Sequence, residues 1–348
     1  MKKVKILFLS HNFNPFIGGI EVISEILATS FSEEGYEVHL LTWTRMLGNK
    51  SFPFKIVRNP NKIKIIREFL WADIVFENNP CLRLAWPALL IFKPLITVLH
   101  TWINRPDNSI ELRDKLKKYI WLKRSTKVIA VSDAIRKEVF NNATIINNPY
   151  RSEQFVVKNT IIKCADFIFL GRLVSDKGVH LAIEALYKLN DLTTGIKFIT
   201  EKPLLTIVGT GPEYSDLLRI VNELNLQDQV SFTGALQGEE VVEYLNKHRF
   251  LLVPSIWDEP FGVVALEAIA CGCIPIVSDT GGLPEAVVNA GLTFERGSVQ
   301  ALVSCIENVL HNPVLEQQLL DAGPTHLVNF RAETVARHYL NIIESVVS

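Results

Sequence analysis

The sequence predicts an α/β protein made of two doubly wound parallel-sheet domains that face a central cleft. The length of 348 residues is enough for two domains, and 48% hydrophobic with 21% charged residues is typical of globular proteins. Between 250 and 278, an apolar strand, an Ala-rich helix (262–271) and a second apolar strand follow one another. This βαβ order indicates a parallel sheet, and similar alternation runs through the rest of the chain.

The first half begins this alternation. A buried strand at 5–10 leads through a loop with Gly18 and Gly19 into a helix at 21–35. Further elements are expected in order: strands at 38–42, 74–77, 96–100 and 128–132, an amphipathic stretch at 62–71 and a helix at 133–140, with 144–148 closing the first domain. The strand–glycine–helix start could bind an anion through free helix amides, or could simply be a tight turn. His100, at the end of its strand, is either a ligand group or a half-buried structural histidine.

The second half continues in the same way. Strands are expected at 166–170, 204–208, 230–233, 250–254 and 273–278, and helices at 179–189, 214–224, 239–247, 262–271, 284–287, 297–310, 313–322 and 331–347. Arg172 and Lys177 lie where the strand at 166–170 passes into a helix. Their spacing would let them reach one diphosphate from two sides, although isolated surface charges are the default interpretation.

The charge is divided unequally along the chain. Residues 1–154 carry 23 Lys and Arg against 14 Asp and Glu, and residues 155–348 carry 13 against 23. The basic half is expected to meet something anionic. The most basic run, Arg113 to Lys127, is either an amphipathic helix on an anionic membrane surface or an ordinary solvated helix face. Nucleic acid is disfavoured because no binding motif accompanies the run.

Cysteines and apolar runs indicate the compartment. The five cysteines are odd in number and scattered, which favours small buried side chains in a reducing cytoplasm over disulfides or a metal site. The apolar run at 6–9 is too short for a signal-peptide core. The apolar window 82–99 is interrupted by Pro87, Lys93 and Pro94, so a membrane span is not expected.

Two carboxylates stand out around the helix at 262–271. Glu259 lies in the loop before the helix and Glu267 within it. Both could face the crevice beyond the strand ends, together with the first helix amides at Phe261, Gly262 and Val263. Acceptors and donors combined in this way suit the hydroxyls of a sugar. The alternative is that one glutamate caps the helix and the other is a surface charge.

This segment resembles a known signature. Glu259 and Glu267 within EPFGVVALEA, followed by GG-x-PE at Gly281, resemble the motif of the retaining GT-B glycosyltransferases of family 4. The turn from Gly209 through Gly211 to Glu213 is similar to the family's G-x-G-P-E. Two departures are Asp176, where the family usually has Glu, and Asn147-Asn148, where it often has Asn-Gly.

The resemblance implies two Rossmann-like domains: an acceptor domain at 1–152, joined by the helix at 331–348, and a donor domain at 153–330. It implies that Glu267 holds the donor ribose, that Glu259 and the amides of 261–263 hold the sugar, and that Arg172 and Lys177 neutralise the leaving diphosphate. The remaining donor-binding residues would be Gly18, Gly19, Gly209 and Gly211. His100 would lie near the sugar from the other domain.

The expected function is transfer of a hexosyl group, with glucosyl favoured, from a UDP-sugar to a saccharide or lipid-linked acceptor in surface polysaccharide or glycolipid assembly. No cofactor or metal is expected, since the cations replace it and no Asp-x-Asp motif is present. The protein would work in the cytoplasm, with possible peripheral contact at the inner face of an anionic membrane through the basic first domain. Two alternatives stay open: a sugar-nucleotide epimerase on the same fold, and a nucleotide-sugar-binding protein without catalysis.

Overall fold

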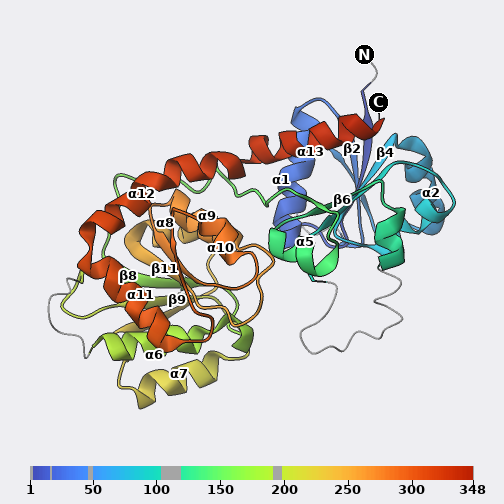
Figure 1. The fold of residues 1–348 in the computed structure, drawn as a ribbon. Coiled ribbons are helices and arrows are strands. Elements are labelled where there is room, and N and C mark those ends of the chain that lie inside the picture. Colours follow the sequence, from blue (N-terminus) through green and yellow to red (C-terminus); the bar gives the residue numbers. More distant parts are fainter. Residues whose placement is uncertain (1–2, 16–17, 46–49, 103–118, 191–197, 348) are drawn as a thin grey trace. The chain divides into compact units, whose positions relative to one another are not determined.

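The structure is a computed structural model that describes residues 3–15, 18–45, 50–102, 119–190 and 198–347. The chain divides into two compact units (Figure 1). Unit 1 comprises Met1–Tyr150 and Phe330–Ser348, and unit 2 comprises Arg151–Asn329. The chain therefore leaves unit 1 once and returns to it at its end.

Unit 1 contains a parallel sheet in the order β3-β2-β1-β4-β5-β6-β7. The strands are β1 (Lys5–Leu9), β2 (Glu37–Thr42), β3 (Lys55–Arg58), β4 (Ile74–Asn78), β5 (Leu95–Leu99), β6 (Lys127–Ala130) and β7 (Thr144–Ile145). Its helices are α1 (Gly19–Glu33), α2 (Lys62–Trp71), α3 (Leu82–Ala85), the 3-10 helix η1 (Trp86–Leu89), α5 (Asp133–Val139) and α13 (Ala332–Val347), and residues 119–124 are also helical. The central strands are apolar because helices cover both faces of the sheet.

Alternate side chains of the unit 1 strands point to opposite faces. On one face, Phe8 and Phe76 pack with Phe31 of α1 and Tyr339 of α13. On the other face, strand residues such as Leu7 and Val75 pack against α2, α3, η1 and Trp121 of the 119–124 segment. The returning helix is thus part of the core of unit 1.

Unit 2 contains a second parallel sheet, in the order β10-β9-β8-β11-β12-β13. The strands are β8 (Ala165–Leu170), β9 (Leu205–Val208), β10 (Val230–Gly234), β11 (His248–Val253), β12 (Ile274–Ser278) and β13 (Leu292–Phe294). The helices are η2 (Ser175–Lys177), α6 (Val179–Leu189), α7 (Tyr214–Glu223), α8 (Glu239–Lys247), α9 (Val263–Ala270), α10 (Leu283–Val287), α11 (Val299–His311), α12 (Pro313–Leu327) and η3 (Val328–Phe330), the last of which runs into unit 1.

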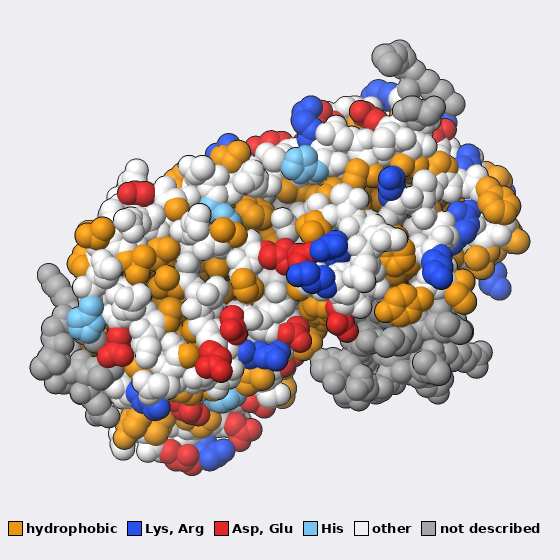
Figure 2. Space-filling view, in the orientation of Figure 1, with side chains coloured by type: hydrophobic (Ala, Val, Ile, Leu, Met, Phe, Trp, Pro, Cys, Tyr) orange, Lys and Arg blue, Asp and Glu red, His pale blue; other side chains and the backbone are white. Residues whose placement is uncertain are grey.

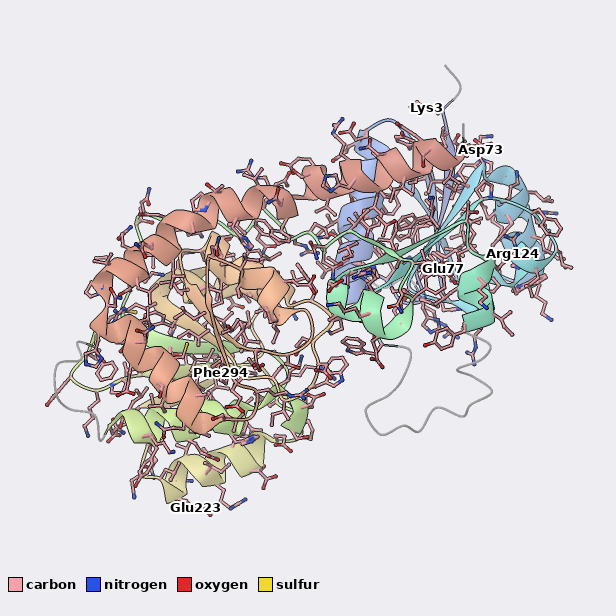
Figure 3. The ribbon with its side chains drawn as sticks, viewed as in Figure 1. Lys3, Asp73, Glu77, Arg124, Glu223 and Phe294 are labelled. Carbon is pink, nitrogen blue, oxygen red and sulfur yellow. The ribbon has the colours of Figure 1, made fainter. Side chains whose placement is uncertain are left out.

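The larger core of unit 2 lies between one face of this sheet and α6, α7 and α11. Phe294 on β13 belongs to it and is labelled in Figure 3. Helix α9 packs on β11 and β12 and is itself covered by α12. Both units are doubly wound, and the predicted class, α/β with two parallel sheets, is confirmed.

Several helices begin where a side chain can accept from a free backbone amide. Asn61 accepts from Lys64 at the start of α2, and Ser132 accepts from Ile135 at the start of α5. Ser298 and Asn312 cap α11 and α12 in the same way. These short polar residues explain why the helices start where they do.

The structure corrects the expected elements at a few places. Strands β3 and β13 and the helical pair α3–η1 were not predicted, because each is too short to show a clear hydrophobic period. Lys127, expected on a basic helix, instead begins β6, where it pairs with Ile96 of β5. Helix α12 continues through Pro324 to Leu327, beyond the predicted end at 322, and packs against α9.

Candidate functional site

The strand order of unit 2 identifies where a ligand should bind. From β8 the order proceeds through β9 to β10 on one side and through β11 to β12 on the other. The connections that follow β8 and β11 therefore lead to opposite sides of the sheet, and the switch point lies between these two strands. Such a switch point is where open α/β sheets bind ligands. The loop after β8 carries Arg172 and Lys177, and the loop after β11 carries Glu259.

Lys177 and Glu259 meet at this switch point. The Lys177 Nζ forms a hydrogen-bonded ion pair with Glu259 Oε1. Ser255, which is buried directly after β11, donates its hydroxyl to the same oxygen at 2.6 Å. Side chains of the pair are 20% and 12% exposed, so the pair is shielded without being sealed from solvent. The structure thus brings together two residues that are 82 positions apart in the sequence.

The backbone holds these two loops against each other. The carbonyl of Asp176 accepts from the amides of Ile256 at 2.8 Å and Trp257 at 3.2 Å. Lys177 Nζ also lies 5.8 Å from the centre of the Trp257 ring, in cation–π geometry. Gly178 follows with φ +64°, and a Cβ there would lie 2.0 Å from the Pro254 carbonyl oxygen. Only glycine fits this close approach.

The glycine pair after β12, Gly281 and Gly282, contacts the backbone of Glu259. The amide of Gly282 donates to the Glu259 carbonyl at 2.7 Å. Gly281 has φ +55°, and a Cβ there would lie 2.1 Å from the same carbonyl oxygen. The GG-x-PE motif therefore fixes the backbone of the loop that carries Glu259.

Arg172 lies on a different part of the β8 loop. It is exposed, and its neighbour Leu173 exchanges backbone hydrogen bonds with Thr210 and Glu213. Gly209 and Gly211 make this contact possible, because a Cβ on either would lie about 2 Å from the carbonyl oxygen of Gly171 or Leu173 (1.8 and 2.1 Å). In the structure these two glycines position the Arg172 loop; their predicted contact with a donor stays a prediction.

Glu267 and the start of α9 complete the predicted group. Helix α9 begins at Val263, with Gly262 as its N-cap at φ +113° and the ring of Phe261 buried. Glu267 is half-buried on the helix. Burial raises the pKa of its carboxyl to about 7, and Arg151 offsets only part of this effect. Near neutral pH this side chain can therefore bind as a carboxylate or as an acid.

Gly18, Gly19 and His100 belong to unit 1, where His100 is part of a second polar group and the two glycines begin α1. Gly18 is the extended N-cap of α1, and Gly19 is the first residue of the helix. One turn later, Ser24 accepts from the amide nitrogen of Asn78 at 2.7 Å and bonds Ser10 at 2.8 Å. Asn78 Oδ1 in turn lies 2.6 Å from His100 Nε2. This network spans the ends of β1, β4 and β5, which include the switch point of the first sheet.

The network assigns a tautomer to His100. An amide oxygen only accepts, so Nε2 carries the proton and Nδ1 is the acceptor. His100 is 5% exposed, and within the described residues its Nδ1 has no hydrogen-bond partner. Burial lowers the pKa of the imidazole to about 3, which the neighbouring Asn148 amide opposes only weakly. His100 is therefore neutral at physiological pH and offers a buried acceptor.

Ser24, Asn78, Ser255 and Trp257 were not among the residues predicted from sequence. Each lies on or beside a strand end of a predicted sheet or in the first helix turns after one. Position relative to the strand ends is a signal that could have selected Asn78 and Ser255. No such signal distinguishes Trp257 from any other loop aromatic residue, because its contact with Lys177 depends on the fold.

The predicted membrane-facing run lies only partly within the structure. Residues 113–118 fall outside the described residues, and the described helical part ends at Arg124. Across the described ranges, no helix has both the length and the apolar composition needed to cross a membrane.

The fold defines a class before any relative is considered: two Rossmann-like units, the second with a charged pair at the switch point of its sheet. Comparison with solved structures agrees with this class. Sucrose-phosphate synthase of Thermosynechococcus elongatus superposes with a TM-score of 0.79 at 19% identity, covering 99% of each chain. HepE of Anabaena, in complex with UDP and glucose, gives 0.77 at 18% identity, covering 98% of this chain and 100% of that one. The predicted GT-B fold is confirmed.

A family model gives the more particular assignment. The model described as glycosyl transferases group 1 matches residues 151–326, which is just over half of the chain. The chain belongs to this family. A glycogen synthase of Mycobacterium tuberculosis is 31% identical over 233 residues, which is 62% of this chain and 53% of that relative. The chain therefore spans about half the length of this curated relative.

Proposed function

We propose that this protein is a retaining glycosyltransferase of family 4 that moves a hexosyl group, with glucosyl as the first choice, from UDP to an acceptor. The observation that carries the proposal is the Lys177–Glu259 ion pair at the switch point of unit 2. Family membership supports transfer chemistry. The UDP and glucose named for HepE support the choice of donor.

The donor would bind mainly to unit 2. Glu267 as a carboxylate accepts hydrogen bonds from the ribose hydroxyls, and Glu259 accepts from hydroxyls of the sugar. Lys177, already beside Glu259, donates to the diphosphate, and the exposed Arg172, earlier in the same loop after β8, donates to it from another side. These cations stabilise negative charge as it develops on the leaving UDP. We therefore propose that no metal is required.

The chemical step would proceed on one face of the sugar. The acceptor oxygen forms a bond to the anomeric carbon while the bond from that carbon to the phosphate oxygen breaks. The acceptor proton passes to the departing phosphate oxygen, and UDP leaves with the bonding electron pair. Configuration is retained because entry and departure occur on the same face. His100 is neutral, and its Nδ1, which has no partner among the described residues, would accept a hydrogen bond from a sugar hydroxyl.

The acceptor and the location are also proposals. The first half of the chain is basic, which suits an anionic acceptor such as a lipid-linked phosphate or a growing surface polysaccharide. We propose that the protein works in the cytoplasm, in peripheral contact with the inner face of an anionic membrane through the 1–152 domain.

The test uses three single variants of the full chain. Lys177→Ala and Arg172→Ala should each lower kcat for transfer from UDP-glucose about 100- to 1000-fold, because each removes a donor to the leaving group. Glu267→Ala should weaken UDP binding about 10- to 100-fold, since hydrogen bonds to a charged group are lost. Lys188→Ala, which removes an exposed lysine at the end of α6 in the same unit, is the matched control. Wild-type turnover and UDP affinity in all three variants would contradict the proposal.

A further inference from the structure

Three helical segments cover one face of the unit 1 sheet and form a continuous layer. Helix α2, the α3–η1 pair and residues 119–124 all pack onto the same buried cluster around Leu7 and Val75. Helix α2 also contacts η1 directly. The side of this layer that faces away from the cluster is thus a single surface made by three segments.

That surface is unusually apolar. At the end of η1, Leu89 is 61%, Leu90 72% and Phe92 83% exposed, and Ile120 on the neighbouring segment is 62% exposed. Helix α2 adds Ile63 and Leu70, which are seven positions apart and so on one side of the helix, each about 60% exposed. Single exposed leucines are ordinary, but such a group on one layer indicates an interaction surface.

The same surface is basic. Over 62–71, 82–93 and 119–124 the sequence holds seven Lys and Arg and one acidic residue, Glu68. Glu68 is 3% exposed and already paired with His39, Lys55 and Lys64. Negative side chains are therefore absent from the exposed side of these three described stretches. Hydrophobic and Lys or Arg side chains lie next to one another on unit 1 in Figure 2.

Three contacts fix the 119–124 segment within this layer. Arg124 donates to the Ala88 carbonyl at 3.1 Å and lies 5.3 Å from the centre of the Phe92 ring. Trp121 donates at 2.8 Å to Glu77, which is buried within unit 1 (Figure 3 labels Glu77 and Arg124). The 119–124 segment is thereby tied both to the sheet and to η1. The exposed groups are presented on a fixed surface.

We propose that this surface, centred on Leu89, Leu90, Phe92 and Ile120 with Lys93 and Lys123 beside them, docks onto an anionic lipid bilayer. The aliphatic and aromatic side chains would enter the boundary between headgroups and acyl chains, while the cations meet lipid phosphates. The proposal deepens the peripheral membrane contact proposed above and rests on it, but not on sugar transfer. It assigns the contact to helices α3–η1 and their neighbours instead of to the 113–127 run alone.

A bilayer suits this surface better than an acidic protein does. An acidic partner would need cations arranged for individual carboxylates, with the apolar side chains in matching pockets. Here cations lie beside several highly exposed apolar side chains. This pattern lets the apolar side chains enter the acyl region of a bilayer while the cations meet the negatively charged headgroups. Depth of entry is then set by Phe92 and Leu90, the two most exposed members.

The test is sedimentation of the full chain with vesicles, without any sugar nucleotide. Binding to phosphatidylglycerol-containing vesicles should exceed binding to pure phosphatidylcholine vesicles and should weaken as salt rises from 0.1 to 0.5 M, roughly from a 10 Å to a 4 Å screening length. The triple variant Leu89→Ser, Leu90→Ser, Phe92→Ser should lower the partition coefficient at least about 100-fold, because three inserted side chains are lost. Lys93→Gln and Lys123→Gln should each lower it about fivefold.

The matched control is Ile162→Ser in unit 2, since Ile162 is 84% exposed and lies outside the layer. It should bind vesicles like the wild type. Circular dichroism and UDP affinity, measured on the same samples, show that the triple variant is folded and that its donor site is intact. Lack of binding to anionic vesicles, equal binding to neutral ones, or unchanged binding of the triple variant would each overturn the proposal. Loss of transfer activity with normal vesicle binding would instead count against the proposed function alone.

Discussion

The charged residues of the unit 2 site differ in how strongly the fold has desolvated them. Lys177 and Glu259 share a partly shielded ion pair, Arg172 is exposed, and Glu267 is half-buried on α9. In the absence of a ligand, Lys177 neutralises Glu259, so a bound diphosphate would have to share the cation. For Glu267, the charge of Arg151 is the one among the described residues that offsets part of its burial. Because its pKa is about 7, the Glu267 carboxyl changes its protonation state near neutral pH.

Glu267→Gln tests this desolvation through stability. The folded pKa, about 7, lies above the ordinary value of 4.5, so the folded state holds the proton longer. The stability contribution is complete below about pH 4.5 and is lost as pH rises to about 7. At pH 8 the variant should exceed the wild type by up to about 3 kcal/mol of unfolding free energy, relative to their difference at pH 4.5. Urea unfolding at both pH values measures this.

The control for that experiment is Glu223→Gln. Glu223, labelled in Figure 3, is an exposed acid on α7 of the same unit. It pairs with Arg219. Its difference from the wild type should change little between pH 4.5 and pH 8, since exposed pairs contribute little. A Glu267→Gln difference that is equally independent of pH would show that the carboxyl is not desolvated.

At the scale of elements, the site depends on how closely three loops approach one another. Gly178, Gly281 and Gly282 place the backbones of the loops after β8 and β12 against the loop after β11. The ion pair and the Ser255 hydrogen bond form because these loops are in contact. Helix α9, which follows the loop after β11, packs closely against α12 at Gly323, where a Cβ would lie 3.0 Å from Ile269.

Gly178→Ala should therefore lower the free energy of unfolding far more than the same change at Gly297, a glycine with a similar positive φ but with open space around its would-be Cβ. Gly297 has φ +75° and no atom within 4 Å of its would-be Cβ, whereas Gly178 has φ +64° and meets a carbonyl oxygen at 2.0 Å. Alanine at 297 should cost about 1 kcal/mol of unfolding free energy. Alanine at 178 should cost at least 2 kcal/mol more and lower kcat, because Lys177 moves. Similar losses in both variants would show that the close approach is not required.

At the scale of the whole molecule, the chain makes two units but does not complete the first until its last helix. Helix α13 packs on α1, and Tyr339 fills the space beside Phe31 and Phe76. Its ring is fully buried, and its hydroxyl has no partner among the described residues. The folding of unit 1 is thus linked to residues that follow unit 2 in the sequence.

Tyr339→Ala and Tyr339→Phe separate the packing of this ring from its hydroxyl. The alanine variant should lose about 3–5 kcal/mol from the unfolding of unit 1. The phenylalanine variant should be as stable as the wild type or more so, because an unsatisfied buried hydroxyl is removed. Hydrogen exchange resolves the two units, and only amides of unit 1 should lose protection in Tyr339→Ala. Equal loss of protection in unit 2 would contradict this division.

Much of the fold could be predicted from the sequence. Long apolar runs gave nearly all central strands, and the helices between them followed from hydrophobic periodicity. Elements such as β13 and η1 were missed because three or four residues carry too little pattern. Lys127 was misplaced because a basic residue is acceptable both at a helix end and at the start of a strand, and only pairing with β5 decides between them.

For the site, the sequence alone determined which residue types stand after the strands: Arg172 and Lys177 before the helix at 179–189, Glu259 before the helix at 262–271, and His100 at the end of a strand in the first domain. The tertiary structure decided which of them meet. Glu259 pairs with Lys177 and accepts from Ser255, and Gly209 and Gly211 position the Arg172 loop. Glu267 and His100 are desolvated enough to shift their pKa values. The reason is physical: spacing along a chain constrains only neighbours in sequence, whereas distance, burial and charge pairing arise once β8 and β11 lie side by side.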